Sequence, residues 1–142
     1  MLKSVAVRKT CAVVIVCSVL LFNASFIVQG RVKTETSIDT FWTKFKAAVM
    51  KEDKQALSEM VKYPMEMPYG FSAIKTKAAF IKRYKEVFYR QANAKICFAQ
   101  QSPKKSDDHP NTYEVWCGEA VVYYFVWTKS GWKLDSLDNI NE

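Results

Sequence analysis

Hydrophobic residues recur with helical spacing in three segments of the first two thirds of the chain. In SIDTFWTKFKAAVM, residues 37–50, they fall on one helix face at Ile38, Phe41, Trp42, Phe45, Val49 and Met50. Ser37 is the predicted N-cap of this helix, and Asp53 is the predicted N-cap of a second one, which ends at Tyr63-Pro64 because the residue before a proline disfavours helix. Thr76 is the predicted N-cap of a third helix over residues 77–91.

After Asn93 the hydrophobic period drops to two, which is typical of strands. AKICFAQ, residues 94–100, is predicted to be a strand, and SPKKSDDHPN, residues 102–111, is predicted to be a loop. Residues 112–128 then follow as one long strand bent at Gly118, and residues 131–140 close the sheet after a turn. Between the second and third helices, residues 65–75 form a brief extended segment. Helices followed by strands predict an α+β fold, with three N-terminal helices packed on a curved antiparallel sheet.

The N-terminus has the pattern of a secretory signal. Lys3, Arg8 and Lys9 precede an uncharged apolar stretch at residues 10–22, and small residues follow it. We expect residues 1–30 to be a signal peptide cut after Gly30, with a cut after Ala24 or an uncleaved anchor as alternatives. The remainder, residues 31–142, would form a single domain that is periplasmic or extracellular and has no stable membrane insertion after cleavage.

The formal net charge of +7 includes three basic residues of the signal segment. The smaller positive charge left after processing does not indicate nucleic-acid binding.

Two cysteines flank the predicted loop. Cys97 and Cys117 are equally far from the centre of residues 102–111 to within one residue, so a hairpin would place them opposite each other. An exported domain is exposed to oxidising conditions, and an even cysteine count leaves no odd thiol. We therefore predict a structural disulfide between Cys97 and Cys117 across neighbouring antiparallel strands, with a pair of buried free thiols as the alternative.

Three stretches resemble the nuclear-transport-factor-2-like (NTF2-like) superfamily, whose cone-shaped α+β fold is shared with scytalone dehydratase and ketosteroid isomerase. FWTKFKAAVMKEDKQALSEMV is similar to its opening helix pair, IKTKAAFIKRYKEVF to its third helix, and SGWKLDSLD to its closing strand. The resemblance implies a curved sheet wrapped on helices, with a pocket at the open end of the cone. It is strongest to small exported bacterial members, for which a defined activity is generally lacking, and the fold hosts enzymes, ligand binders and assembly modules alike.

Catalytic signatures are scarce in the sequence. His109 is the single histidine, which excludes a histidine-rich zinc site, and its place beside a proline in a polar loop favours a solvated residue over a catalytic one. Asp107, Asp108 and His109 could bind a metal loosely, but a solubilising loop explains them better. We expect no cofactor and no metal site. Among the acids near the strands, Glu66 is the candidate pocket acid, because Met65, Met67 and Tyr69 surround it in sequence.

The chain is rich in aromatic residues, which either fill a small core or line an apolar pocket. The candidate pocket residues are Glu66, Tyr69, Tyr84, Trp116 and Tyr124. Two hypotheses follow. The favoured one is a non-enzymatic exported domain that binds a protein partner or a small apolar ligand, with homodimer formation left open. The alternative is an isomerase or lyase that uses Glu66 with a tyrosine such as Tyr84.

Overall fold

The computed structural model describes residues 37–141. The predicted signal peptide, its cleavage site and the polar segment at residues 31–36 lie outside the described residues. Within residues 37–141, no helix is both long enough and apolar enough to cross a membrane.

Helices occupy most of the first half of the described chain and strands most of the second half. The elements are α1 (Ile38–Lys51), α2 (Lys54–Glu59), β1 (Val61–Glu66), α3 (Lys77–Lys85), the π-helix η1 (Glu86–Arg90), α4 (Ala94–Gln100), β2 (Lys104–Lys105), β3 (Thr112–Cys117), β4 (Val121–Thr128) and β5 (Gly131–Asn139).

Three helices begin where their capping residues predict. The side chains of Ser37, Asp53 and Thr76 each accept a hydrogen bond from the backbone N–H three residues ahead, at 3.2, 2.9 and 3.2 Å. Each cap satisfies an N–H group that the first helical turn leaves without a partner. The predicted starts of the three helices are therefore confirmed.

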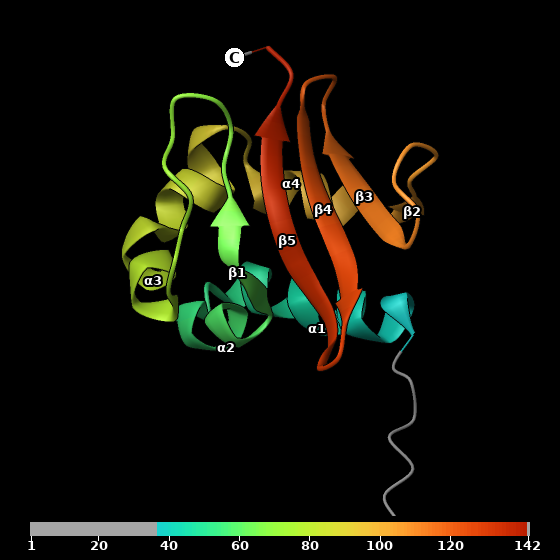
Figure 1. Cartoon of the computed structure of the whole chain (residues 1–142), viewed down its shortest axis with the longest axis horizontal. Coiled ribbons are helices and arrows are strands. Elements are labelled where there is room, and N and C mark those ends of the chain that lie inside the picture. The colour runs from blue at the N-terminus through green and yellow to red at the C-terminus, as the bar shows by residue number, and fades with distance from the viewer. Residues whose placement is uncertain (1–36, 142) are drawn as a thin grey trace, which may run out of the picture. The chain divides into compact units, whose positions relative to one another are not determined.

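The five strands form one sheet in the order β1-β5-β4-β3-β2. The helices cover one face of this sheet and leave the other face open (Figure 1). All neighbouring strands are antiparallel except β1, which pairs with β5 in parallel. The predicted α+β class, with helices packed on a curved sheet, is confirmed.

The predicted strand at residues 94–100 is wrong, because this segment is helix α4. Asn93 caps the helix by accepting a hydrogen bond from the backbone N–H of Ile96 at 3.4 Å. The buried residues are Ala94 and Phe98, whose spacing of four is helical, while Ile96 is 60% exposed. Over seven residues the alternation fits both periods, and packing of Phe98 in the core selects the helix.

Two further boundaries differ from the predictions. Residues 112–128 are not one strand but a hairpin, with Cys117 opposite Val121, and the turn uses Gly118 at φ 73°. A positive φ suits glycine, so Gly118 reverses the chain where we expected only a bend. The second helix stops at Glu59, so that Tyr63-Pro64 lies within β1. The third helix has nearly its predicted extent, but its last part, Glu86–Arg90, is the π-helix η1.

Cys97 and Cys117 form a disulfide, with their Cα atoms 5.4 Å apart. The predicted pairing is confirmed, but its predicted setting between two strands is wrong. Cys97 lies on α4 and Cys117 ends β3, so the bond joins the helical layer to the sheet.

Aromatic side chains fill the space between the helices and the sheet. Their ring centroids lie 4.9 to 6.4 Å apart in a continuous network. Every member is buried, and the members are Phe41, Trp42, Phe45, Phe80, Tyr84, Phe88, Phe98, Tyr123 and Phe125. The interior, where the family resemblance implies a pocket, is packed with side chains.

Candidate functional site

Tyr84, a predicted pocket residue, belongs to the packed interior. Its side chain is 1% exposed, and its hydroxyl has no hydrogen-bond partner among residues 37–141. Burial, followed by the nearby Tyr89 and Glu52, raises the pKa of the Tyr84 phenol. The ammonium group of Lys54 lies 5.4 Å from the centre of the Tyr84 ring. Tyr84 is therefore a neutral phenol in the core, with one polar atom unsatisfied.

Glu66, the predicted pocket acid, lies on the other side of the sheet. Glu66 pairs with Ser136 of β5, and Ser136 in turn pairs with Tyr124 of β4, so these three residues share the open face. Glu66 is exposed, whereas the preceding Met65 is fully buried. Tyr69, in the loop after β1, is 86% exposed. The structure does not bring Glu66 and Tyr84 together.

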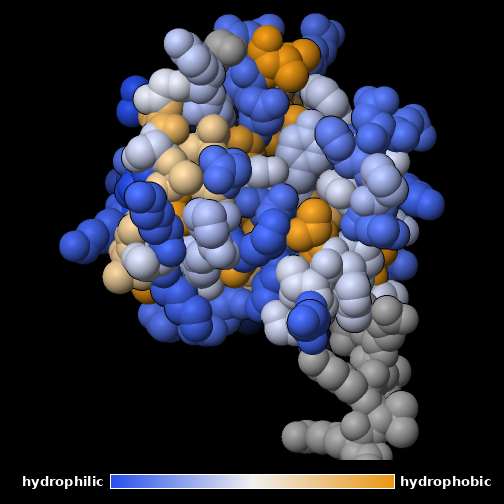
Figure 2. Space-filling model, in the orientation of Figure 1, coloured by the Kyte–Doolittle hydropathy of each residue, from blue (hydrophilic) through white to orange (hydrophobic). Residues whose placement is uncertain are grey.

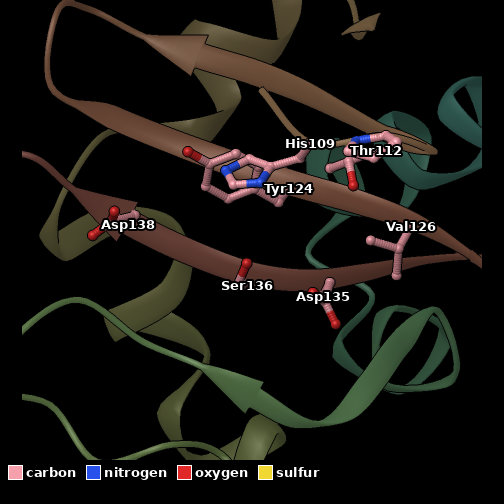
Figure 3. Close-up of a pocket in the computed structure, with 8 residues that line it drawn as sticks. His109, Thr112, Tyr124, Val126, Asp135, Ser136 and Asp138 are labelled. Atoms are coloured by element: carbon pink, nitrogen blue, oxygen red, sulfur yellow. The ribbon is translucent and has the colours of Figure 1, made fainter. Parts of the chain in front are cut away.

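The open face of the sheet carries a shallow depression of about 410 Å³, which we call the outer-face trough (Figure 3). Its lining residues come from the loop before β3 and from strands β3, β4 and β5: His109, Pro110, Thr112, Tyr124, Val126, Asp135, Ser136 and Asp138. The ring of His109 meets the ring of Tyr124 edge-on, with centroids 5.8 Å apart. This face is mainly hydrophilic, with separate small hydrophobic areas (Figure 2).

Acidic groups dominate the electrostatics of the outer-face trough. Burial, and then the carboxylates of Glu114, Asp138 and Asp108, raise the pKa of Tyr124. Asp135 is already engaged, because its carboxylate accepts a hydrogen bond from the ammonium group of Lys62 at 2.5 Å. Trp116, another predicted pocket residue, lies on the same face, two positions along β3 from Glu114.

The described residues include no group of three or more histidine, cysteine or acidic side chains that could hold a metal ion. The chemistry of the trough is that of a weakly acidic polar surface, without an activated nucleophile.

A larger groove lies on the side of the sheet that the helices cover, where the start of α1 approaches β3, β4 and β5. We call it the aromatic groove. Its volume is about 820 Å³, it is open to solvent, and it is lined by Ser37, Ile38, Asp39, Lys105, Asn111, Tyr113, Trp127 and Trp132. The first turn of α1 and the lower ends of these strands are near one another in Figure 1.

Three aromatic rings form a row in the aromatic groove. Trp132 meets Tyr113 edge-on at a centroid distance of 5.2 Å and Trp127 at 5.4 Å. The two tryptophans are directly opposite each other in the β4–β5 hairpin, and Tyr113 pairs with Phe125 one strand away. Trp127 remains 37% exposed, which is unusual for so large an apolar side chain. The strands thus hold a rigid aromatic row that the core does not use fully.

Polar side chains without a hydrogen-bond or ion-pair partner in residues 37–141 surround this row. The side chains of Asp39, Lys105 and Asn111 make no hydrogen bond or ion pair with any residue in 37–141. Asn111, at φ 63°, has a left-handed backbone that asparagine tolerates better than most residues. A ligand in the groove would find an acceptor-only carboxylate, a donor-only ammonium group and an amide beside the aromatic rings.

None of the residues that line the aromatic groove was among the predicted pocket residues. A signal for the tryptophan pair does exist in the sequence. Residues opposite each other in a hairpin have numbers with a constant sum, so the turn at residues 128–131 already places Trp127 opposite Trp132.

Comparisons with known proteins give structural matches only. No protein-family model matches this chain, and no curated protein matches its sequence. Nine chains of solved structures match it. An NTF2-like protein with a cystatin-like fold from Novosphingobium aromaticivorans has 15% identity over 68% of this chain and 74% of that chain, with a TM-score of 0.37.

Two further structures give the same result. A domain of unknown function with a cystatin-like fold from Nostoc punctiforme has 9% identity, covers 78% of each chain and has a TM-score of 0.44. An NTF2-like protein of unknown function from Cytophaga hutchinsonii has 12% identity over 75% of this chain and 90% of that chain, with a TM-score of 0.40. At such identities no site residue transfers, so function is argued from this chain's own side chains.

Proposed function

We propose that this domain binds a ligand without transforming it, and that the aromatic groove is the binding site. The observation that carries the proposal is the row of Tyr113, Trp132 and Trp127, which lines an open groove beside polar side chains that have no partner within the described residues 37–141. Ligand sites combine a mainly apolar, aromatic lining with a few polar groups that fix orientation. The aromatic groove has both, and its volume is within the range of small-molecule sites.

The alternative of an isomerase or lyase has less support. A general acid or base must lie within hydrogen-bond reach of the reacting group, in the same pocket as its partner. Glu66 and Tyr84 are on opposite sides of the sheet, and aromatic side chains pack the space around Tyr84. An enzyme of that kind would have to expel part of this core to admit its substrate.

Export is part of the proposal. The basic and apolar segments at residues 1–22 favour it, and the disulfide between Cys97 and Cys117 is typical of oxidising compartments. Outside the cytoplasm, the groove would be available to an extracellular ligand or to a protein partner.

The test is a ligand screen by nuclear magnetic resonance with the isotope-labelled protein. A mixture of small apolar and amphipathic compounds should shift the backbone signals of residues near Trp127, and Trp127→Ala should remove the effect. Trp116→Ala is the matched control, because it removes the same side chain from the open face of the sheet and should preserve binding. Shifts confined to the surroundings of Tyr84, or to the outer-face trough, would contradict the proposed site.

A further inference from the structure

We infer that the ligand of the aromatic groove is a saccharide chain. The inference rests on the proposed function and adds the chemical class of the ligand. It follows from two properties of the groove taken together: a row of aromatic rings in which Trp127 is exposed and Tyr113 and Trp132 are partly buried, and the mixed donor and acceptor character of the polar side chains around it.

The aromatic row suits the apolar side of a sugar ring. A pyranose presents C–H groups on its faces and hydroxyl groups around its edge, so it packs on an indole or phenol ring while its hydroxyls stay free. Trp132 is in contact with a ring on each side, at 5.2 and 5.4 Å, so the row extends over three rings. Neighbouring rings are steeply inclined to each other, at 87° and 70°, so the exposed ring of Trp127 is the main packing position for a sugar ring.

The polar side chains select a ligand rich in hydroxyl groups. The carboxylate of Asp39 only accepts hydrogen bonds, the ammonium group of Lys105 only donates them, and the amide of Asn111 does both. A ligand that displaces water from all three must therefore supply donors and acceptors close together, or leave a polar group unpaired. Sugar hydroxyls do both.

Other ligand classes match this pattern less well. An acyl chain or a sterol-like molecule could pack on Trp127 but offers few polar groups to Asp39 and Lys105. A proline-rich peptide also docks in aromatic-lined grooves. Its prolines lack N–H groups, so it brings many acceptors and few donors for the carboxylate of Asp39. One carboxylate and one ammonium group together give the groove no net charge, which fits a neutral ligand.

The groove is also suited in shape and rigidity. It is open to solvent rather than enclosed, which suits a ligand that is only partly covered by the protein. Trp127 and Trp132 are fixed on paired strands, and Tyr113 is fixed on the next strand. Aromatic side chains have few rotatable bonds, so little conformational entropy is lost when they bind a ligand.

The experiment is titration calorimetry of the whole protein with hexasaccharides of the cello-, xylo-, manno-, chito- and malto- series. We expect at least one series to bind. We expect Trp127→Ala to weaken that binding by about tenfold or more, as is common for aromatic residues at the centre of a site. Asp39→Asn, an exposed and nearly isosteric change, should weaken the same binding by several-fold, and Trp116→Ala should leave it unchanged.

The outcomes separate this inference from the proposed function. If small apolar compounds or a proline-rich peptide shift the signals of the groove while no hexasaccharide binds, the ligand class is wrong and the binding site remains. If neither sugars nor other compounds bind at the groove, both proposals fail. Sugar binding that survives both Trp127→Ala and Asp39→Asn would also overturn the inference, because it would place the sugar elsewhere.

Discussion

Removing the disulfide between Cys97 and Cys117 should destabilise the domain by a calculable amount. The two cysteines are 20 residues apart in sequence. The chain-entropy model assigns about 3 kcal/mol to a cross-link that closes a loop of this length, because the open chain gains conformational freedom when it unfolds. For a domain of this size, 3 kcal/mol corresponds to a decrease in melting temperature of roughly 10–20 °C.

The cross-link itself is isolated by comparing the oxidised protein with the same protein under a reductant. Urea denaturation should give a free energy of unfolding about 3 kcal/mol lower for the reduced form. Cys97→Ala/Cys117→Ala is the second variant, since alanine does not place a hydroxyl group in the buried site of Cys117. Equal unfolding free energies for the oxidised and reduced proteins would refute the reasoning, as would two titratable thiols in the unreduced, denatured chain.

Three further predictions follow from the buried tyrosines, from one surface carboxylate and from the N-terminal pattern. Tyr84→Phe should leave the free energy of unfolding unchanged or raise it, because its hydroxyl has no partner. Tyr123→Phe should lower the free energy of unfolding by about 1–3 kcal/mol, because the Tyr123 hydroxyl donates a buried 2.7 Å hydrogen bond to the carbonyl of Val87. Urea denaturation of the two variants measures the difference, and equal effects of Tyr84→Phe and Tyr123→Phe would contradict this account.

Hydrogen bonds from Lys95 and Tyr89 hold the pKa of Glu52 below its ordinary value of 4.5. The contribution of Glu52 to the free energy of unfolding is therefore complete above pH 4.5 and is lost as the pH falls through the lowered pKa. Between pH 6 and pH 2, the free energy of unfolding should therefore fall less steeply in Glu52→Gln than in the unmodified protein. Equal slopes for the two proteins would show that Glu52 does not contribute to the pH dependence. Finally, intact-mass measurement should show that the exported protein starts near Arg31, and a mass that retains residues 1–22 would disprove the signal peptide.

Helix starts could be predicted from the sequence because they depend on local chemistry. A side chain at Ser37, Asp53 or Thr76 reaches a backbone N–H only three residues away, and no distant segment is needed. The end of each helix depends on packing instead. The second helix stops at Glu59, before the predicted end at Tyr63-Pro64, because Val61–Glu66 pairs with β5 as strand β1.

The strand predicted at residues 94–100 failed because seven residues cannot separate the two periods. Ala94, Ile96 and Phe98 alternate with polar neighbours, yet only Ala94 and Phe98 are buried. The contact of Phe98 with Trp42, at 4.9 Å between ring centroids, joins segments more than fifty residues apart. A long-range contact of this kind overrides the local pattern, and it explains why the disulfide pairing was right while its structural setting was wrong.

The candidate pocket acid shows the same limit for the site. Glu66 has apolar neighbours in sequence, but neighbours in a strand point to opposite faces. Met65 therefore fills the core, and Glu66 faces the open side with Ser136. The apolar neighbours in sequence correctly indicated that β1 packs on the core, but they did not indicate the environment of the Glu66 side chain.

Some features of the aromatic groove can be predicted from the sequence, and others depend on the fold. The opposition of Trp127 and Trp132 follows from the position of one turn, and is therefore as predictable as a helix cap. Asp39, Lys105 and Asn111 belong to a helix, a two-residue strand and a loop, and they share the groove only because the sheet brings these segments together. Because these three side chains make no hydrogen bond or ion pair within residues 37–141, substitutions among them should change the polar groups of the groove while the aromatic row and the core stay intact.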